Sequence, residues 1–250
     1  MLNVIAAVGG IAPIIGPLVG AVILQMSGWR VSFWTVAALG VTMIIAVLVA
    51  VPETLPADRR HAGGLRTFVT TSREVLRNRR YVGYVIVSGT AMGAVFAYVA
   101  TSAFVLQSMN GLSPIAYSVD FAANAAGMTV AALSAARLAG RIDTRKVILV
   151  GQVSALAAGI GMLVGAVWFA TPLWVALVCF FVLMTAQGLI DPNGGALAAA
   201  EVPEHPGTGS ALLGFVQWVV AGTIAQSPAS AVNTRPSRWP SSWLPPSPPP

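Results

Sequence analysis

Long apolar runs, broken only by short loops, dominate this sequence and leave few folds open to it. A helix that crosses a bilayer needs about 20 mainly apolar residues, and seven such runs follow one another along the chain. Only 9% of the residues are charged, against about 25% in soluble domains. We therefore predict an all-α membrane protein with about seven spans. The expected spans are 1–23, 33–51, 81–106, 114–138, 147–168, 173–190 (or on to 200) and 207–226.

The positive charge gathers in two loops between these runs. Residues 53–80 hold seven arginines against three acidic residues, and residues 137–146 hold four basic residues against one. A nucleic-acid interface would need interleaved aromatic residues or a folded basic face, which neither loop shows. Short basic loops are typical of the cytoplasmic side of membrane proteins. The pattern predicts a multi-pass protein of the plasma membrane with both loops inside, the uncharged turns 107–113 and 169–172 outside, and no nucleic-acid partner.

Two segments between or after the spans carry patterns of their own. In the first basic loop, apolar or small residues recur at helical spacing, which predicts a short amphipathic helix on the membrane surface; a solvated linker is the alternative. Residues 227–250 include eight prolines and six serines, so we expect this tail to be extended or disordered. The residues of the amphipathic face are Leu65, Phe68, Val69, Ser72 and Leu76.

Ionisable groups at membrane depth are costly and are by default candidates for function. Asp120 lies about two turns into the fourth span, with Asn124 one turn further and Tyr117 three residues before. This face could bind a proton or a cationic substrate; the alternative is a solvated carboxylate near the outer interface. Asp191 precedes Pro192, and Asp-Pro favours turns, so we expect it to cap or bend a helix end.

Other polar, aromatic and small residues within the spans admit two interpretations each. Buried glutamines could line a cavity or join helices; aromatic and thioether side chains could line a drug cavity or simply pack. Gly-xxx-Gly pairs allow helices to approach closely, although about two or three pairs arise by chance at this glycine content. The residues concerned are Gln152, Gln187 and Gln217; Phe96, Tyr98, Met128 and Trp218; and the pairs Gly16–Gly20, Gly89–Gly93 and Gly161–Gly165.

Enzymatic and metal chemistry find no support in the sequence. It contains no HExxH, GxSxG, Walker A or GxGxxG motif. His61 and His205 have no ligand-spaced partners, and Cys179 stands alone. We therefore expect neither an enzyme, nor a metal site, nor a cofactor.

The first apolar run carries a more specific pattern. Gly16-Pro17-x-x-Gly20 resembles the antiporter signature in the fifth helix of drug:proton antiporters of the major facilitator superfamily. The sequence has Ala12 and Ala21 where the usual pattern has glycine. The run from Leu138 to Lys146, with Arg141 and Arg145 and with Arg137 before it, is similar to a second, degraded copy of the superfamily's basic loop motif. It lacks the usual Asp after Leu-Ala. We expect Arg137 to reach the cytoplasmic surface.

Further motifs resemble the Bcr/CflA subgroup of drug-resistance transporters. With the patterns above they cover residues 1 to about 226 in the expected order. They are Gly28-Trp29-Arg30-x-x-Phe33, Pro52-Glu53-Thr54-Leu55, Asp191-Pro192-Asn193 and the run from Gly207 to Gly214.

The resemblance implies a partial helical bundle of that superfamily, corresponding to helices five to eleven of twelve. It assigns 1–52 to the end of the first half, 53–80 to the cytoplasmic loop, 81–226 to the second half without its last helix, and 227–250 to a tail that we attribute to a frame change. The implied function is export of small amphipathic drugs in exchange for protons, by alternating access. A non-functional remnant, or a transporter of another small solute, stays open. Oligomeric state is not predicted.

Overall fold

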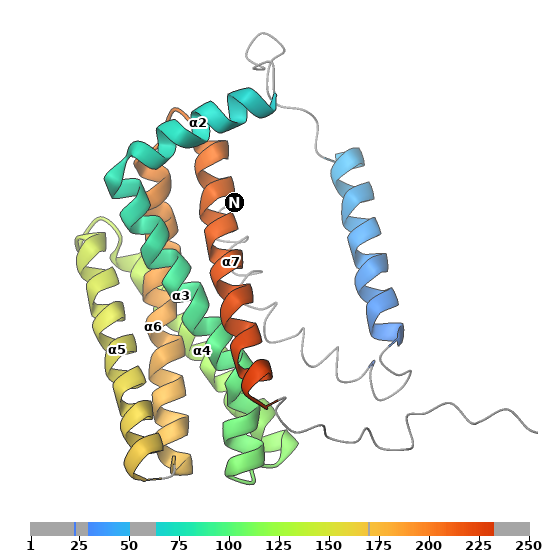
Figure 1. Cartoon of the computed structure of the whole chain (residues 1–250), viewed down its shortest axis with the longest axis vertical. Helices are drawn as coiled ribbons and strands as arrows, with labels where there is room; N and C mark the ends of the chain where they lie inside the picture. Colours follow the sequence, from blue (N-terminus) through green and yellow to red (C-terminus); the bar gives the residue numbers. More distant parts are fainter. Residues whose placement is uncertain (1–22, 24–29, 51–63, 170, 233–250) are drawn as a thin grey trace, which may run out of the picture.

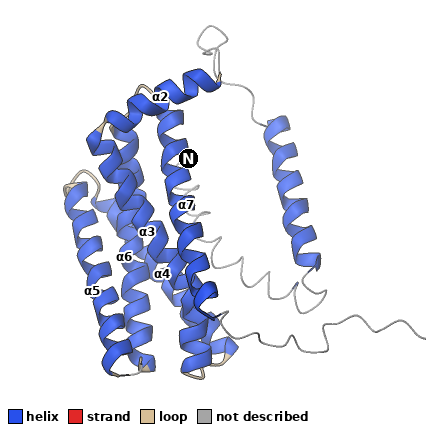
Figure 2. Cartoon of the chain, viewed as in Figure 1, coloured by secondary structure: helices blue, strands red, loops and turns tan. Residues whose placement is uncertain are grey.

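The computed structural model is helical throughout the residues that it describes, which are 23, 30–50, 64–169 and 171–232. Figure 2 shows no strand in this part of the chain, and the one backbone bridge joins Ala139 to Ile142 in a turn. Six of the helices are long and apolar enough to cross a membrane. The predicted all-α membrane fold is therefore confirmed; the expected span 1–23 lies almost entirely outside the described residues.

The helix bounds agree closely with the apolar runs. The helices of 25 residues are about 37 Å long at 1.5 Å per residue, enough to cross a hydrocarbon core of about 30 Å. The sixth run continues without interruption to Ala200, the longer of the two expected ends. The helices are Arg30–Ala50, α2 (Leu65–Arg77), α3 (Arg79–Ala103) with a π-helical turn at Phe104–Met109, α4 (Pro114–Leu138), α5 (Thr144–Trp168), α6 (Leu173–Ala200) and α7 (Pro206–Val232).

Helix α6 lies at the centre of the bundle. Helices α3, α4 and α5 all pack against it, while α7 packs mainly against α3 (Figure 1). Close approach depends on glycine: a Cβ at Gly188 of α6 would collide with the backbone carbonyl of Met128 in α4, and one at Gly93 of α3 would lie 2.6 Å from Ile224 of α7. The bundle is therefore held by small residues that let backbones meet, as is usual for helices in lipid.

Both Gly-xxx-Gly pairs inside the described residues contact a neighbouring helix. A Cβ at Gly89 would lie 3.0 Å from Val216, so this pair receives side chains of α7. The pair Gly161–Gly165 on α5 receives Cys179 and Val175 of α6. The third pair, Gly16–Gly20, falls outside the described residues.

The helix Arg30–Ala50 stands apart from the bundle (Figure 1). None of its residues is buried, and its large apolar side chains are exposed, for example Phe33 at 70% and Leu48 at 78%. A membrane helix can expose such residues to lipid tails, which are as apolar as leucine. Its apolar surface is therefore compatible with a bilayer but is not covered by the described bundle.

The predicted amphipathic helix forms as α2, but its inward face is shifted from the expected one. Ser72 and Val75 are buried against α3 and α7, whereas Phe68, Val69 and Leu76 stay about half exposed. Val75 was not among the residues expected on the apolar face, and the side chain of Leu65 is not described. The helix lies across the ends of other helices (Figure 1), so its central turn packs on protein and the neighbouring apolar residues face outward.

The segment after α7 begins later than expected. We expect an extended or disordered tail from Ser227, but α7 continues for six residues more, through Val232. One proline, Pro228, removes a single backbone donor, and the three residues before Val232 are small, so the last turn persists. Residues 233–250 lie outside the described part of the chain.

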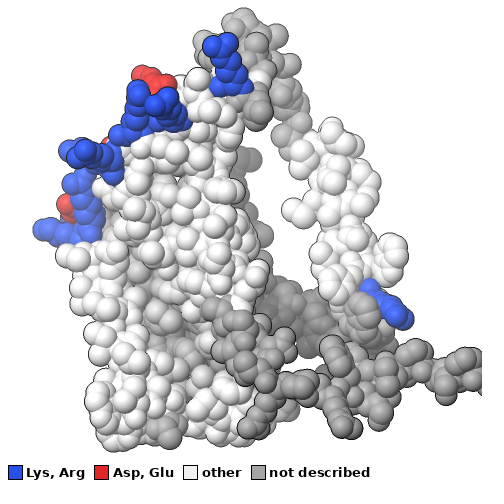
Figure 3. All heavy atoms as spheres, in the orientation of Figure 1, with Lys and Arg blue, Asp and Glu red and all other residues white. Residues whose placement is uncertain are grey.

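The charges mark one end of the bundle. Figure 3 shows Lys and Arg over the end of the bundle that carries α2, whereas the described surface of the bundle at the opposite end is white in this view; a further blue group lies at the opposite end of the separate helix. The turn between α4 and α5 lies at the α2 end as well (Figure 1). This is the arrangement that the positive-inside bias predicts, so we call the α2 end of the bundle the cytoplasmic end and the opposite end the outer end, according to that prediction.

Candidate functional site

A cluster of polar side chains joins α3 and α4 in the outer half of the bundle. The side-chain nitrogen of Asn124 donates to Asp120 Oδ2 at 2.9 Å and to the hydroxyl of Tyr98 at 3.1 Å. Asn124 and Tyr98 are each 1% exposed, and Asp120 is partly buried. Asp120 and Asn124 meet because residues four apart lie on the same helix face. We call these three residues the outer cluster.

Neighbouring contacts hold the outer cluster in place. The hydroxyls of Ser102 and Tyr117 lie 3.0 Å apart and form a second bridge between α3 and α4. The ring of Tyr98 stacks on Phe121, with centroids 5.9 Å apart, and meets the edge of Phe180 at 5.1 Å. Aromatic contacts of this kind stabilise one ring orientation, so the Tyr98 hydroxyl is directed at Asn124.

A second carboxylate lies in the other half of the bundle. Gln217 of α7 donates from Nε2 to Asp191 Oδ1 of α6 at 2.8 Å. The expectation that Asp191 caps a helix end is wrong, because α6 continues for nine residues beyond it and Pro192 lies inside the helix. Asn193 donates to the carbonyl of Leu189. We call Asp191 and Gln217 the inner pair.

The two carboxylates lie at different depths. Asp120 is six residues from the outer start of α4, about 9 Å along the axis. Asp191 is nine residues from the cytoplasmic end of α6, about 14 Å along that axis. The outer cluster and the inner pair are therefore separate sites, one in each half of the bundle.

Several buried polar atoms, in the outer cluster and elsewhere inside the bundle, have no hydrogen-bond partner among the described residues. They are Asn124 Oδ1, Thr185 Oγ1, Gln187 Oε1 and Ser88 Oγ. Gln187 lies near the middle of α6 and is 1% exposed. Buried polar groups are usually paired with protein or water, so these acceptors and hydroxyls offer bonding capacity to water or to a bound polar group inside the bundle.

The predicted site residues fall into separate places. Asp120 and Asn124 share the outer cluster and Tyr117 adjoins it, whereas Gln217 lies with Asp191 in the inner pair. Ser102 was missed, although its position one turn after Tyr98 was a usable signal. Arg137, Arg141, Arg145 and Lys146 lie at the cytoplasmic ends of α4 and α5 and are exposed. The proposed antiporter-motif residues Gly16, Pro17 and Gly20 lie outside the described residues.

The remaining aromatic and titratable candidates do not extend either site. The rings of Phe96 and Trp218 meet edge to face, with their centroids 5.7 Å apart. Because Trp218 is 64% exposed, this pair faces outward between α3 and α7. His205 lies 3.6 Å from Glu74 and connects α2 to the turn before α7. In the described part of the chain, no group of three His, Cys, Asp or Glu residues lies close enough to hold a metal.

Comparison with known proteins agrees with the helical architecture. The profile of the Major Facilitator Superfamily matches residues 1–225. An uncharacterized MFS-type transporter, YdgK of Bacillus subtilis, is 27% identical over 235 residues, covering 93% of this chain and 57% of the relative. A bicyclomycin resistance protein homolog of Haemophilus influenzae is 20% identical, covering 92% and 58%. Multidrug resistance protein MdtL of Escherichia coli is 25% identical, covering 72% and 45%. The chain thus spans about half the length of these relatives.

Proposed function

The chain belongs to the Major Facilitator Superfamily, and we propose that it contributes to the export of small amphipathic cations in exchange for protons. It is a multi-pass protein of the inner membrane, and relatives named for drug resistance are among its matches. The sequence motifs that resemble the Bcr/CflA subgroup favour the export of small amphipathic drugs, and the restriction to cations rests on Asp120. Because the chain spans about half of these relatives, the exchange activity is proposed for a transporter of which this chain supplies one bundle.

The observation that carries the proposal is the position of Asp120. Asp120 belongs to a spanning helix, and its carboxylate accepts a hydrogen bond from the buried amide of Asn124, next to the stacked rings of Tyr98 and Phe121. A carboxylate in such a place can bind one positive charge at a time, either a proton or a lipophilic cation. Competition for that group would couple the two ions without any further chemistry. Aromatic faces nearby also attract cations.

The exchange can be tested on the chain itself in lipid nanodiscs. Tetraphenylphosphonium is the probe, and both its binding and the protons released into weakly buffered solution are measured. We expect Asp120→Asn to weaken binding at least tenfold and to abolish proton release. Asp191→Asn is the matched control, since it alters the other intramembrane carboxylate, and it should retain both signals within about threefold. Equal loss in both variants, or proton release that persists in Asp120→Asn, would contradict the assignment.

Export itself is proposed to need a second helical bundle. Alternating access requires two groups of helices that rock around a central site, and the described residues form one bundle and one separate helix. Expressed alone in an efflux-deficient strain, the chain should give no proton-dependent export above an empty vector; export would refute this requirement. If the chain neither binds the cation nor supports export with a co-expressed helical partner, the remnant interpretation is favoured instead.

A further inference from the structure

A groove opens between α3 and α5 at the cytoplasmic end of the bundle. Both helices pack against α6 but hardly against each other, so the space between them stays open above α6. At the cytoplasmic end this space is a cavity of about 490 Å³. Its lining is made of two arginines, two neutral polar residues and four apolar or small residues: Arg80, Gly83, Tyr84, Val87, Arg145, Ile148, Leu149 and Gln152.

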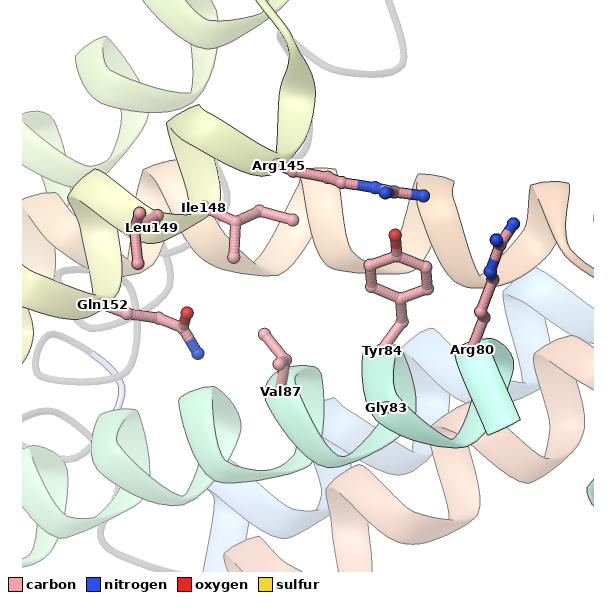
Figure 4. A pocket seen from close by; sticks show the side chains of 8 residues that line it. All are labelled: Arg80, Gly83, Tyr84, Val87, Arg145, Ile148, Leu149 and Gln152. Atoms are coloured by element: carbon pink, nitrogen blue, oxygen red, sulfur yellow. The ribbon is translucent and has the colours of Figure 1, made fainter. Parts of the chain in front are cut away.

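The polar side chains at this cavity have no protein partner. Arg145 of α5 extends toward the Tyr84 hydroxyl of α3, Arg80 lies beside it, and the Gln152 amide points into the gap (Figure 4). None of these four side chains has a hydrogen bond or ion pair within the described residues. No acidic residue lines the cavity. The site therefore offers two positive charges and several neutral donors to a ligand that supplies negative charge.

Apolar residues line the groove between the arginines and Gln152. Val87, Ile148 and Leu149 follow the arginines toward the middle of the membrane. Gln152 is the lining residue of α5 that lies farthest from the cytoplasmic end (Figure 4). Further along the same two helices lies a second cavity of about 400 Å³. Its residue Met162 is about 27 Å from the start of α5 and Tyr98 of the outer cluster also lines it, so this cavity is not part of the groove. A free phosphate or a soluble anion would leave the apolar surface of the groove uncovered. An amphipathic anion with an acyl chain would cover both the arginines and the apolar residues beside them.

We propose that this groove binds one anionic phospholipid of the cytoplasmic leaflet. The phosphate lies between Arg80 and Arg145, the Tyr84 hydroxyl and Gln152 amide donate to the phosphate or the glycerol esters, and an acyl chain follows Val87 and Ile148. Basic pockets between helices on the cytoplasmic side are suited to anionic headgroups. Arginine is also well matched to phosphate because its planar donors can bond two oxygens at once. The site lies away from the outer cluster and is independent of the proposed exchange.

The proposal is tested by titrating the purified chain with dioleoylphosphatidylglycerol and, separately, with dioleoylphosphatidylcholine, and counting bound lipids by native mass spectrometry. The wild-type chain should bind one phosphatidylglycerol at least tenfold more tightly than phosphatidylcholine. Near an anionic surface each arginine contributes about fivefold, so Arg80→Gln/Arg145→Gln should weaken this binding about 25-fold. The matched control, Arg66→Gln/Arg73→Gln, removes two exposed arginines of α2 that do not line the groove and should change it less than threefold.

A second variant tests the groove without changing its charge. A Cβ at Gly83 meets no atom within 4 Å, so Gly83→Phe can fill the cavity without a backbone collision and should also weaken phosphatidylglycerol binding at least tenfold. Equal losses in the two arginine pairs, or no loss in Gly83→Phe, would overturn the proposal. So would displacement of the lipid by millimolar inorganic phosphate, because the site would then recognise a free anion. Thermal unfolding of each variant confirms that the chain is folded.

Discussion

The outer cluster and the inner pair both fix an intramembrane carboxylate with a side-chain amide, but they do so in different ways. Asp120 receives its hydrogen bond from Asn124, one turn along the same helix. Asp191 receives its bond from Gln217, 26 residues away on another helix. The first contact follows from helix geometry alone, whereas the second requires that α6 and α7 be brought together. A local pair can thus be expected from spacing, and a long-range pair cannot.

The surroundings of the two carboxylates also differ. The outer cluster depends on α3 and α4, each packed closely on α6, with Gly188 set against the backbone of Met128. At the inner pair, α6 and α7 meet over a small area, and α7 is held mainly by the glycines of α3. Substitutions that disturb the packing of helix backbones should therefore have their largest effect at the outer cluster. At the inner pair, the largest loss of unfolding free energy should come from removing the hydrogen bond.

The largest effect is expected from Gly188→Val. The new side chain would collide with the Met128 carbonyl, and because a backbone atom cannot move aside cheaply, α4 would be displaced from α6. Overpacking of this kind costs up to about 3 kcal/mol of unfolding free energy. Denaturation in mixed detergent and SDS micelles measures it, and cation binding at Asp120 should fall as well.

Gly159→Val is the control for that substitution. Gly159 lies on α5, and a Cβ there meets no atom within 4 Å, so stability should change by less than about 1 kcal/mol. If Gly188→Val were equally mild, the close packing of α4 on α6 would not be what positions the outer cluster.

A smaller effect is expected from Gln217→Leu in the inner pair. The substitution removes the donor and leaves the Asp191 carboxylate without its bond, which costs about 2 kcal/mol of unfolding free energy. The double variant Asp191→Leu/Gln217→Leu removes both polar groups and should regain most of that loss. With the single variant Asp191→Leu added, unfolding in the same micelles completes a double-mutant cycle. An additive loss in the double variant would mean that the two residues do not interact.

The smallest effect is expected from Tyr98→Phe in the outer cluster. Only the hydroxyl that accepts from Asn124 is lost, while the ring keeps its contacts with Phe121 and Phe180. Hydrogen bonds between membrane helices contribute about 0.6 kcal/mol on average, and we expect a loss of that size. A loss above about 2 kcal/mol would show that the hydrogen bonds of the outer cluster act as a cooperative network. They would then contribute more to stability than the bond of the inner pair, contrary to our expectation.

Features that depend on neighbouring residues could be predicted from the sequence, whereas features that depend on contacts between distant helices could not. The spans were accessible because hydropathy reports helices directly; the bounds of α4 agree with the expectation at both ends. The buried face of α2 differs from the predicted one at Val75, because burial there depends on α3 and α7 lying beneath its central turn. Asp191 lies inside a helix and not at its end, because Pro192 is accommodated within α6 although Asp-Pro favours turns in isolation.

The apolar runs and basic loops of the sequence thus determine by themselves that this chain is a helical membrane protein whose basic loops gather at one end of the bundle. Those properties depend on the free energy of transferring each segment into lipid, which is local and additive. Only the tertiary structure decided that α6 is central, that Gln217 belongs with Asp191, and that Arg80 and Arg145 flank one groove. Such pairings depend on which helices can approach closely, and glycine contacts between distant segments settle that in three dimensions.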